Sequence, residues 1–295
     1  MKRSLGLTLI AAIMLGATGT AIASAQEVVE EPEYIEILKP TTDRFSPDIE
    51  IVSPQPDELL NATTVPLQLK LKRFPAGQDE ETGLGLHVKV IVDNGDPIDY
   101  FDLSEPLMLD LAPGTHTIRV VAARPWDASY RSLSAFEHVT FHVQAADGQN
   151  APRFENTAAL LTVVSPSGTY GAEPILLDYI VDGINLSRFP SGPKVRYTLN
   201  DNESVITPSR APIYLTGFQP GSNRLVVELV RGDGVEFNNE GTGYNRIERE
   251  IIYQPGKTDG LALMVRGEGK LSDYKGALGP EPFIYDDAGK PTPLR

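Results

Sequence analysis

The clearest signal in this sequence is a strict alternation of apolar and polar positions in short runs. Val65, Leu67, Leu69 and Leu71 point one way while the residues between them, mostly polar, point the other. A period of two is typical of a strand with one buried face. Similar apolar runs predict further strands at residues 86–92, 98–103, 107–111, 115–122 and 136–143. No run shows a sustained helical period, so the sequence predicts an all-β protein.

The chain carries its strand pattern twice. Pro113–Val121 recurs as Pro220–Glu228, and both copies open with a Pro-Gly turn. Arg73–Gly77 matches Arg188–Gly192 at four of five positions. About seven short strands per repeat, separated by turn signals, are typical of an immunoglobulin-like (Ig-like) β-sandwich. We therefore predict two tandem Ig-like β-sandwiches, at residues 49–143 and 158–254, joined by a linker at residues 144–157.

The two ends of the chain lack this pattern. Lys2 and Arg3 precede an apolar run and an Ala-Ser-Ala cleavage site, which predicts a secretory signal peptide at residues 1–25. Residues 26–48 are acidic without a sustained period, so we expect a disordered acidic arm. Residues 255–295 are rich in Gly and Pro and predict an irregular tail. Its apolar stretch Leu261–Val265 is expected to form an extra edge strand or a docking segment.

Charge and cysteine usage narrow the classes of partner. The chain has 26 basic and 40 acidic residues, a net charge of −14 at pH 7. Such a charge repels nucleic acids and anionic membrane surfaces, so we expect no nucleic-acid partner and no membrane insertion after signal cleavage. The absence of Cys removes thiolate ligands, cysteine nucleophiles and a lipoprotein anchor. Because of the predicted signal peptide, the chain is expected to be exported, either to the periplasm or outside the cell.

All four histidines lie in the first repeat, which raises the question of a metal site. His87 and His116 are candidate ligands for copper or zinc, and Asp93 and Asp96 in a neighbouring turn offer oxygen ligands. The alternative is that the histidines are scattered and that His116 caps the core, as its counterpart Asn223 does in the second repeat. Asp93 and Asp96 then simply form a hairpin turn. This alternative is favoured, so neither a metal nor another cofactor is predicted.

The stretch Arg124–Arg131 has no counterpart in the second repeat. It contains Trp126, the only Trp of the chain, together with Tyr130, and Phe136 follows closely. Aromatic residues on a loop at the end of a sandwich stack on sugars or anchor protein partners. They also fold onto a core as a lid, with Arg124 paired to an acid. Both interpretations stay open, and Arg124, Trp126, Tyr130 and Phe136 are the candidate binding residues.

The sequence lacks the common catalytic signatures. It has no Gly-x-Ser-x-Gly elbow, no His-Glu-x-x-His motif, no phosphate-binding glycine loop and no dinucleotide fingerprint. We therefore expect a non-catalytic binding or structural protein of the cell envelope or extracellular space, with a protein or polysaccharide partner. The alternatives are a carbohydrate-binding module and a periplasmic copper- or zinc-binding protein.

One segment carries a resemblance to known proteins. Pro113–Val120, with its Pro-Gly-x-His start, is followed by Ala123–Tyr130, which contains Arg-Pro-Trp. This combination resembles uncharacterised exported bacterial proteins, particularly cyanobacterial ones, with Ig-like sandwiches. More loosely, both repeats resemble the Ig-like modules of bacterial adhesins and cell-surface enzymes. The resemblance implies an exported β-domain and carries over no activity, ligand or site residue.

Overall fold

The fold is built almost entirely from β-strands arranged in stacked sheets. The computed structural model describes residues 26–147, 159–202, 204–237, 244–280, 283–285 and 291–293. The predicted signal peptide and most of the predicted linker lie outside these residues. Within the described part of the chain, no helix is both long enough and apolar enough to cross a membrane.

The first sandwich consists of a larger and a smaller sheet. The larger sheet has the order β3-β10-β9-β6-β5, and β7 also pairs with β6. The smaller sheet has the order β2-β4-β8. The strands are β2 (Asp48–Ser53), β3 (Leu59–Leu60), β4 (Thr64–Lys72), β5 (Gly77–Gln78), β6 (Gly85–Val92), β7 (Ile98–Tyr100), β8 (Leu107–Asp110), β9 (Gly114–Ala123) and β10 (Phe136–Val143). A short 3-10 helix, η1 (Leu133–Ala135), precedes β10.

The alternation read from the sequence defines the core of this sandwich. Val65, Leu67 and Leu69 of β4 face Val88 and other apolar side chains of β6, β9 and β10 in one buried cluster. The intervening residues of β4 are exposed. The predicted strand and its buried face are both confirmed.

The second sandwich repeats this plan. One sheet has the order β12-β18-β17-β14-β15, and the other has the order β1-β16-β13-β11. The strands are β1 (Glu27–Val29), β11 (Leu160–Ser165), β12 (Gly168–Tyr170), β13 (Ile175–Asp182), β14 (Lys194–Leu199), β15 (Val205–Thr207), β16 (Ile213–Thr216), β17 (Gly221–Val230) and β18 (Arg246–Tyr253). A separate buried cluster fills the space between the sheets. The prediction of an all-β fold with Ig-like sandwiches is confirmed.

The acidic arm is ordered, which corrects the prediction of disorder. Its strand β1 pairs antiparallel with β16 of the second sandwich. Helix α1 (Glu33–Thr42) follows, with Ile35 and Leu38 buried and two glutamates in its first turn. Acidic residues at a helix N-terminus favour the helix through its dipole. The apolar stripe is short, so tertiary packing rather than a visible period stabilises this helix.

Residues 255–280 are also more ordered than the predicted irregular tail. Helix α2 (Gly260–Arg266) begins where the Asp259 side chain accepts a hydrogen bond from the N–H of Ala262, and it ends at Gly267 in a left-handed conformation. Ala262 and Met264 are buried, so the apolar stretch is a docking helix. Two 3-10 helices and a two-stranded hairpin follow: η2 (Leu271–Tyr274), η3 (Gly276–Leu278), β19 (Phe283–Tyr285) and β20 (Pro291–Pro293).

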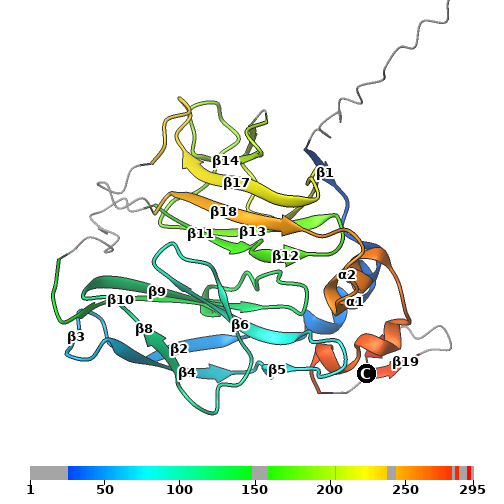
Figure 1. Ribbon diagram of the computed structural model, residues 1–295, viewed down its shortest axis with the longest axis horizontal. Helices are drawn as coiled ribbons and strands as arrows, with labels where there is room; N and C mark the ends of the chain where they lie inside the picture. Colours follow the sequence, from blue (N-terminus) through cyan, green and yellow to red (C-terminus); the bar gives the residue numbers. More distant parts are fainter. Residues whose placement is uncertain are drawn as a thin grey trace, which may run out of the picture.

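The two sandwiches are stacked, and the junction between them buries the outer face of the larger first sheet. Figure 1 shows the second sandwich lying on the first, with α1 and α2 together at one side of the junction. Lys89 of β6 and Arg119 of β9 point away from the first core, yet each is only 1% exposed. Arg119 donates hydrogen bonds to the Leu161 carbonyl at 3.0 Å and to the Thr162 hydroxyl at 3.2 Å. Burial lowers the pKa of Arg119 to about 10, so it still crosses the junction as a cation at neutral pH.

Candidate functional site

The loop after β9 folds into the junction. The Arg124 N–H donates to the Ala128 carbonyl and the Asp127 N–H donates to the Arg124 carbonyl, both at 2.9 Å. Asp127 adopts a positive φ of 69°, which Asp tolerates better than most residues. These bonds form a tight turn that directs the side chain between them, Trp126, inward.

Trp126 is part of a third buried cluster. Its side chain is 1% exposed and packs in a cluster with Ile35 and Leu38 of α1 and Met264 of α2. Leu176 and Tyr214 from the second sandwich and Leu271, Tyr274 and Leu278 from the C-terminal segment complete the cluster. The indole therefore cannot stack on a ligand, and the surface-patch interpretation does not hold for Trp126. The lid interpretation describes it.

Arg124 and Tyr130 form a fixed polar corner beside this cluster. The Arg124 guanidinium lies 4.1 Å from the centre of the Tyr130 ring and pairs with Asp43 at 2.6 Å. The Tyr130 hydroxyl donates to the Thr42 carbonyl at 2.9 Å. Burial raises the pKa of Tyr130 to about 12, which keeps the phenol protonated as a donor. Both side chains are held by the C-terminal end of α1 and the residue after it.

A cleft of about 470 Å³ opens next to this corner, between the two sandwiches. Its size lies within the usual range of about 300–1,000 Å³ for small-ligand sites. The arm, the 124–133 loop, the start of β10, the end of β13 and the segment before β16 all contribute to its wall. The lining residues are Glu31, Lys39, Arg124, Ala128, Ser129, Tyr130, Arg131, Ser132, Leu133, Phe136, Ile180, Val181, Asp182, Arg210, Ala211 and Pro212.

Four cations line the cleft, and three of them are paired with acids. Arg124 is paired with Asp43, and Lys39 contacts Glu31 at 3.0 Å. Arg131 pairs with Asp178 and donates to the Tyr179 carbonyl at 2.7 Å. The fourth cation, Arg210, donates only to the carbonyls of Val181 and Ile184 and the amide oxygen of Asn185, and among the described residues it has no carboxylate within ion-pair distance.

A buried carboxylate fixes the relative position of the two walls. Asp178 of β13 is fully buried and accepts a hydrogen bond from the Ser129 N–H at 2.6 Å, in addition to its pair with Arg131. Ser129 and Arg131 belong to the first sandwich, while Asp178 belongs to the second. Since leaving such a carboxylate unpaired costs several kcal/mol, about 3–5, this contact holds the cleft in one shape.

Only part of this cleft was predictable from the sequence. Arg124, Tyr130 and Phe136 line it as candidate binding residues, and Trp126 supports it from behind. Arg131, Asp182 and Arg210 were missed. They belong to no motif, and they meet only because the second sandwich stacks on the first.

Of the four candidate metal ligands, the structure brings only His116 and Asp93 into contact. His87 pairs across the sheet with Ala123, whereas His116 lies seven residues earlier on the same strand, about 23 Å away at 3.3 Å per residue. His116 instead contacts Asp93 at 2.9 Å and the Ala112 carbonyl at 2.8 Å. Asp96 pairs with Arg249 of the second sandwich at 2.9 Å. His116 and Asp93 therefore stabilise a turn, and Asp96 forms an ion pair across the junction between the two sandwiches.

His87 lies in a different charged cluster, with Asp99 and Asp127. One ligand atom from each of the three lies within 4.8 Å of the others. The Lys89 ammonium contacts Asp99 at 2.7 Å and Asp127 at 3.0 Å, so a cation already lies between the carboxylates. Burial alone would lower the pKa of Lys89, but Asp127 and Asp99 outweigh it and raise that pKa. The cluster is an ion network centred on the buried Lys89, with Asp99 at its exposed edge.

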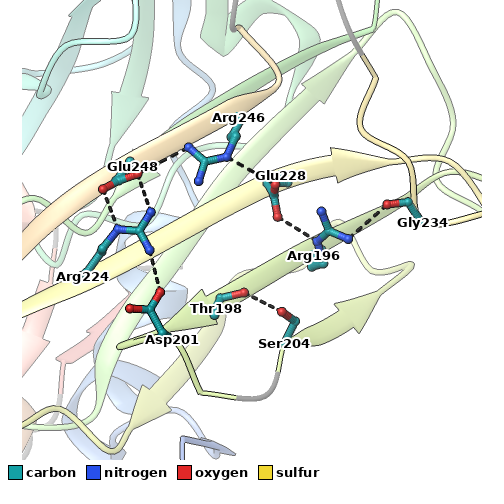
Figure 2. Close-up of polar contacts among 9 residues, drawn as sticks. All are labelled: Arg196, Thr198, Asp201, Ser204, Arg224, Glu228, Gly234, Arg246 and Glu248. Atoms are coloured by element: carbon teal, nitrogen blue, oxygen red, sulfur yellow. Dashed lines mark hydrogen bonds and ion pairs between the residues drawn. The ribbon is translucent and has the colours of Figure 1, made fainter.

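Charged side chains also cover the outer face of the sheet β12-β18-β17-β14-β15 in the second sandwich. Figure 2 shows a ladder in which Arg196, Glu228 and Arg246 alternate in charge across β14, β17 and β18. Arg224 binds both oxygens of Glu248, at 2.6 and 2.7 Å, and also contacts Asp201 at 2.6 Å. Since these charges are satisfied by one another, the ladder offers a solvated face and not a ligand site.

Comparisons with known proteins add little to this geometry. No protein-family model matches the chain, and no curated protein matches it. Among solved structures it is similar to fibronectin(III)-like modules of Clostridium thermocellum CbhA, with 11% identity over 70% of this chain and 94% of that chain and a TM-score of 0.24. It is also similar to Bacteroides ovatus SGBP-B, solved with a mixed-linkage heptasaccharide, with 11% identity, coverages of 70% and 71% and a TM-score of 0.22.

A further similarity is to a putative membrane anchored protein from Corynebacterium diphtheriae, with 14% identity over 71% of this chain and 53% of that chain and a TM-score of 0.25. Likenesses at this level carry no argument about function. The resemblance to cyanobacterial exported proteins stays a prediction.

Proposed function

We propose that this chain is a non-catalytic exported binding protein of the cell envelope or extracellular space, and that the junction cleft holds its ligand. The cleft is concave, whereas protein partners usually bury about 800 Å² of flatter surface on each side. A short oligosaccharide segment suits such a concavity better than a folded protein does. The polysaccharide partner is therefore favoured over a protein partner for this site.

The observation that carries the proposal is the exposed Arg210 guanidinium at the cleft rim. The other three cations of the lining already have carboxylate partners, while Arg210 contacts only neutral acceptors. A guanidinium binds a carboxylate through two parallel hydrogen bonds. Phe136, which is only partly buried, adds ring surface for the apolar face of a sugar. The ligand class is therefore an acidic sugar, such as a uronic acid unit within a polysaccharide, which is attracted locally by Arg210 although the chain carries a net charge of −14.

Titration calorimetry with tetragalacturonate tests this function. The wild-type protein is expected to bind it, and Arg210→Gln is expected to weaken binding by about 10- to 100-fold, the effect of losing one charge-assisted hydrogen-bonded pair. Arg231→Gln is the matched control because Arg231 is exposed and lies outside the cleft. Neutral cellotetraose should bind more weakly than the acidic probe. Equal affinities of the wild type and Arg210→Gln would contradict the proposal.

Among the described residues, the candidate histidines do not support the copper- or zinc-binding alternative. His87 and His116 are far apart on β6 and β9, and Lys89 occupies the space between the carboxylates nearest to His87.

A further inference from the structure

The two repeats contain equivalent loops with opposite exposure. Arg73-Phe74-Pro75 follows β4 and leads to β6, and Arg188-Phe189-Pro190 lies between β13 and β14. Phe74 is 7% exposed, whereas Phe189 is 78% exposed. The two loops share four of five residues but differ in backbone: Arg73 has a φ of 55°, whereas the Gly192 N–H closes a turn onto the Phe189 carbonyl. They also differ in what covers them.

The first loop is covered from two sides: the Phe74 ring packs edge to face on the Tyr130 ring of the core, with centres 5.2 Å apart, and the acidic arm covers the rest. The Phe45 ring meets the Phe74 ring edge to face, with centres 6.3 Å apart. Arg73 donates to the Ser46 carbonyl at 3.1 Å and pairs with Asp48 at 3.4 Å. In this segment an aromatic residue is followed three positions later by an acid. The aromatic residue packs on the ring of Phe74, and the acid pairs with the guanidinium of Arg73.

The second loop presents the same groups without a cover. Arg188, Phe189 and Pro190 are all exposed. Arg188 has no ion pair with any residue in the described part of the chain, and Phe189 belongs to none of the buried clusters there. An exposed aromatic ring beside an unneutralised guanidinium has the composition of an interaction surface.

This loop is held in shape before any partner arrives. The Lys194 ammonium donates to the carbonyls of Phe189, Pro190 and Gly192 at 2.9–3.0 Å. The Gly192 N–H also donates to the Phe189 carbonyl at 3.0 Å. Gly232 approaches so closely that a Cβ there would lie 2.2 Å from the backbone of Ser191. A preformed loop loses little conformational entropy on binding.

We propose that the loop Arg188–Pro190 docks an extended segment of a partner protein that carries an aromatic residue followed three positions later by an acid. The aromatic residue packs against Phe189, and the acid pairs with Arg188. The arm of this chain shows the complementary segment, because Phe45 and Asp48 make these two contacts on the equivalent loop. This surface is separate from the junction cleft and does not depend on the function proposed for it.

A labelled peptide with the sequence of residues 43–49 is the probe, and fluorescence anisotropy with the full chain is the readout. The wild type is expected to bind saturably. Phe189→Ala and Arg188→Gln should each weaken binding at least about tenfold, as should Phe45→Ala or Asp48→Asn in the peptide. Met108→Ala is the matched control, because Met108 is a 56% exposed apolar side chain that lies outside both this loop and the junction cleft.

Three outcomes would overturn this proposal. The first is no saturable binding of the peptide. The second is binding that Phe189→Ala leaves unchanged, since the peptide would then be displacing the arm from Phe74. The third is dimerisation of the full chain that rises with concentration and that Phe189→Ala abolishes, because the occupant would then be a second copy. Circular dichroism of the variants checks that each is folded.

Discussion

Trp126 fills the space where α1, α2 and the two sandwiches meet. Its ring packs among aliphatic and aromatic side chains from four separate segments of the chain. The indole N–H has no acceptor in the described part of the chain. Packing of the ring, rather than a hydrogen bond, is therefore what this residue contributes, and an interior at near-crystalline density does not tolerate its loss.

Replacing Trp126 by Ala is expected to reduce the free energy of unfolding by about 3–5 kcal/mol, because it leaves a cavity at the junction. Trp126→Phe keeps most of the ring and removes the unsatisfied N–H, so it should cost much less. Leu133→Ala, at an exposed position in the same loop region, should stay within about 0.5 kcal/mol of the wild type. Urea denaturation followed by far-ultraviolet circular dichroism measures all three. A stability for Trp126→Ala equal to that of the wild type would place the residue outside the core.

At the scale of single elements, the alternation of side chains explains both faces of the second sandwich. Val195, Tyr197 and Leu199 of β14 enter the core, and Arg196 between them joins the outer ladder (Figure 2). Arg196, Glu228 and Arg246 lie directly opposite one another on adjacent strands, where opposite charges stabilise a sheet. The strands themselves are readable from this alternation. The helices are not, because each has few buried apolar side chains, Ile35 and Leu38 in α1 and Ala262 and Met264 in α2, and depends on its neighbours.

Acidification should weaken the ladder. Hydrogen bonds from Arg224 lower the pKa of Glu248 from 4.5 to about 2. The folded state therefore binds fewer protons than the unfolded state between these values, and the stability contributed by Glu248 is present above pH 4.5 and lost as the pH falls toward 2. Melting temperatures of the wild type and Glu248→Gln should thus differ at pH 7 and converge as the pH approaches 2. High salt should also reduce the difference, since the pair is exposed. A difference that stays constant with pH would rule out this role for Glu248.

At the scale of the whole molecule, stacking of the two sandwiches buries side chains that the alternation in the sequence places on an outer face. His87 and Lys89 alternate with core residues of β6 and Arg119 lies on the same outer face, yet all three are buried, Arg119 against the second sandwich. The duplication, the strands and three of the four candidate loop residues at the cleft were predictable from local pattern. The junction, the inward turn of Trp126 and the contribution of Arg210 were not, because each depends on contacts between segments far apart in the chain.

A crystal structure of the protein grown with tetragalacturonate tests the proposed binding site most directly. A sugar unit is expected in the junction cleft, with its carboxylate paired to Arg210 and a ring face against Phe136. Wild-type crystals should show this density, and Arg210→Gln crystals grown under the same conditions should lack it. An empty cleft in wild-type crystals, or an oligosaccharide bound on another surface, would contradict the assignment of the junction as the ligand site.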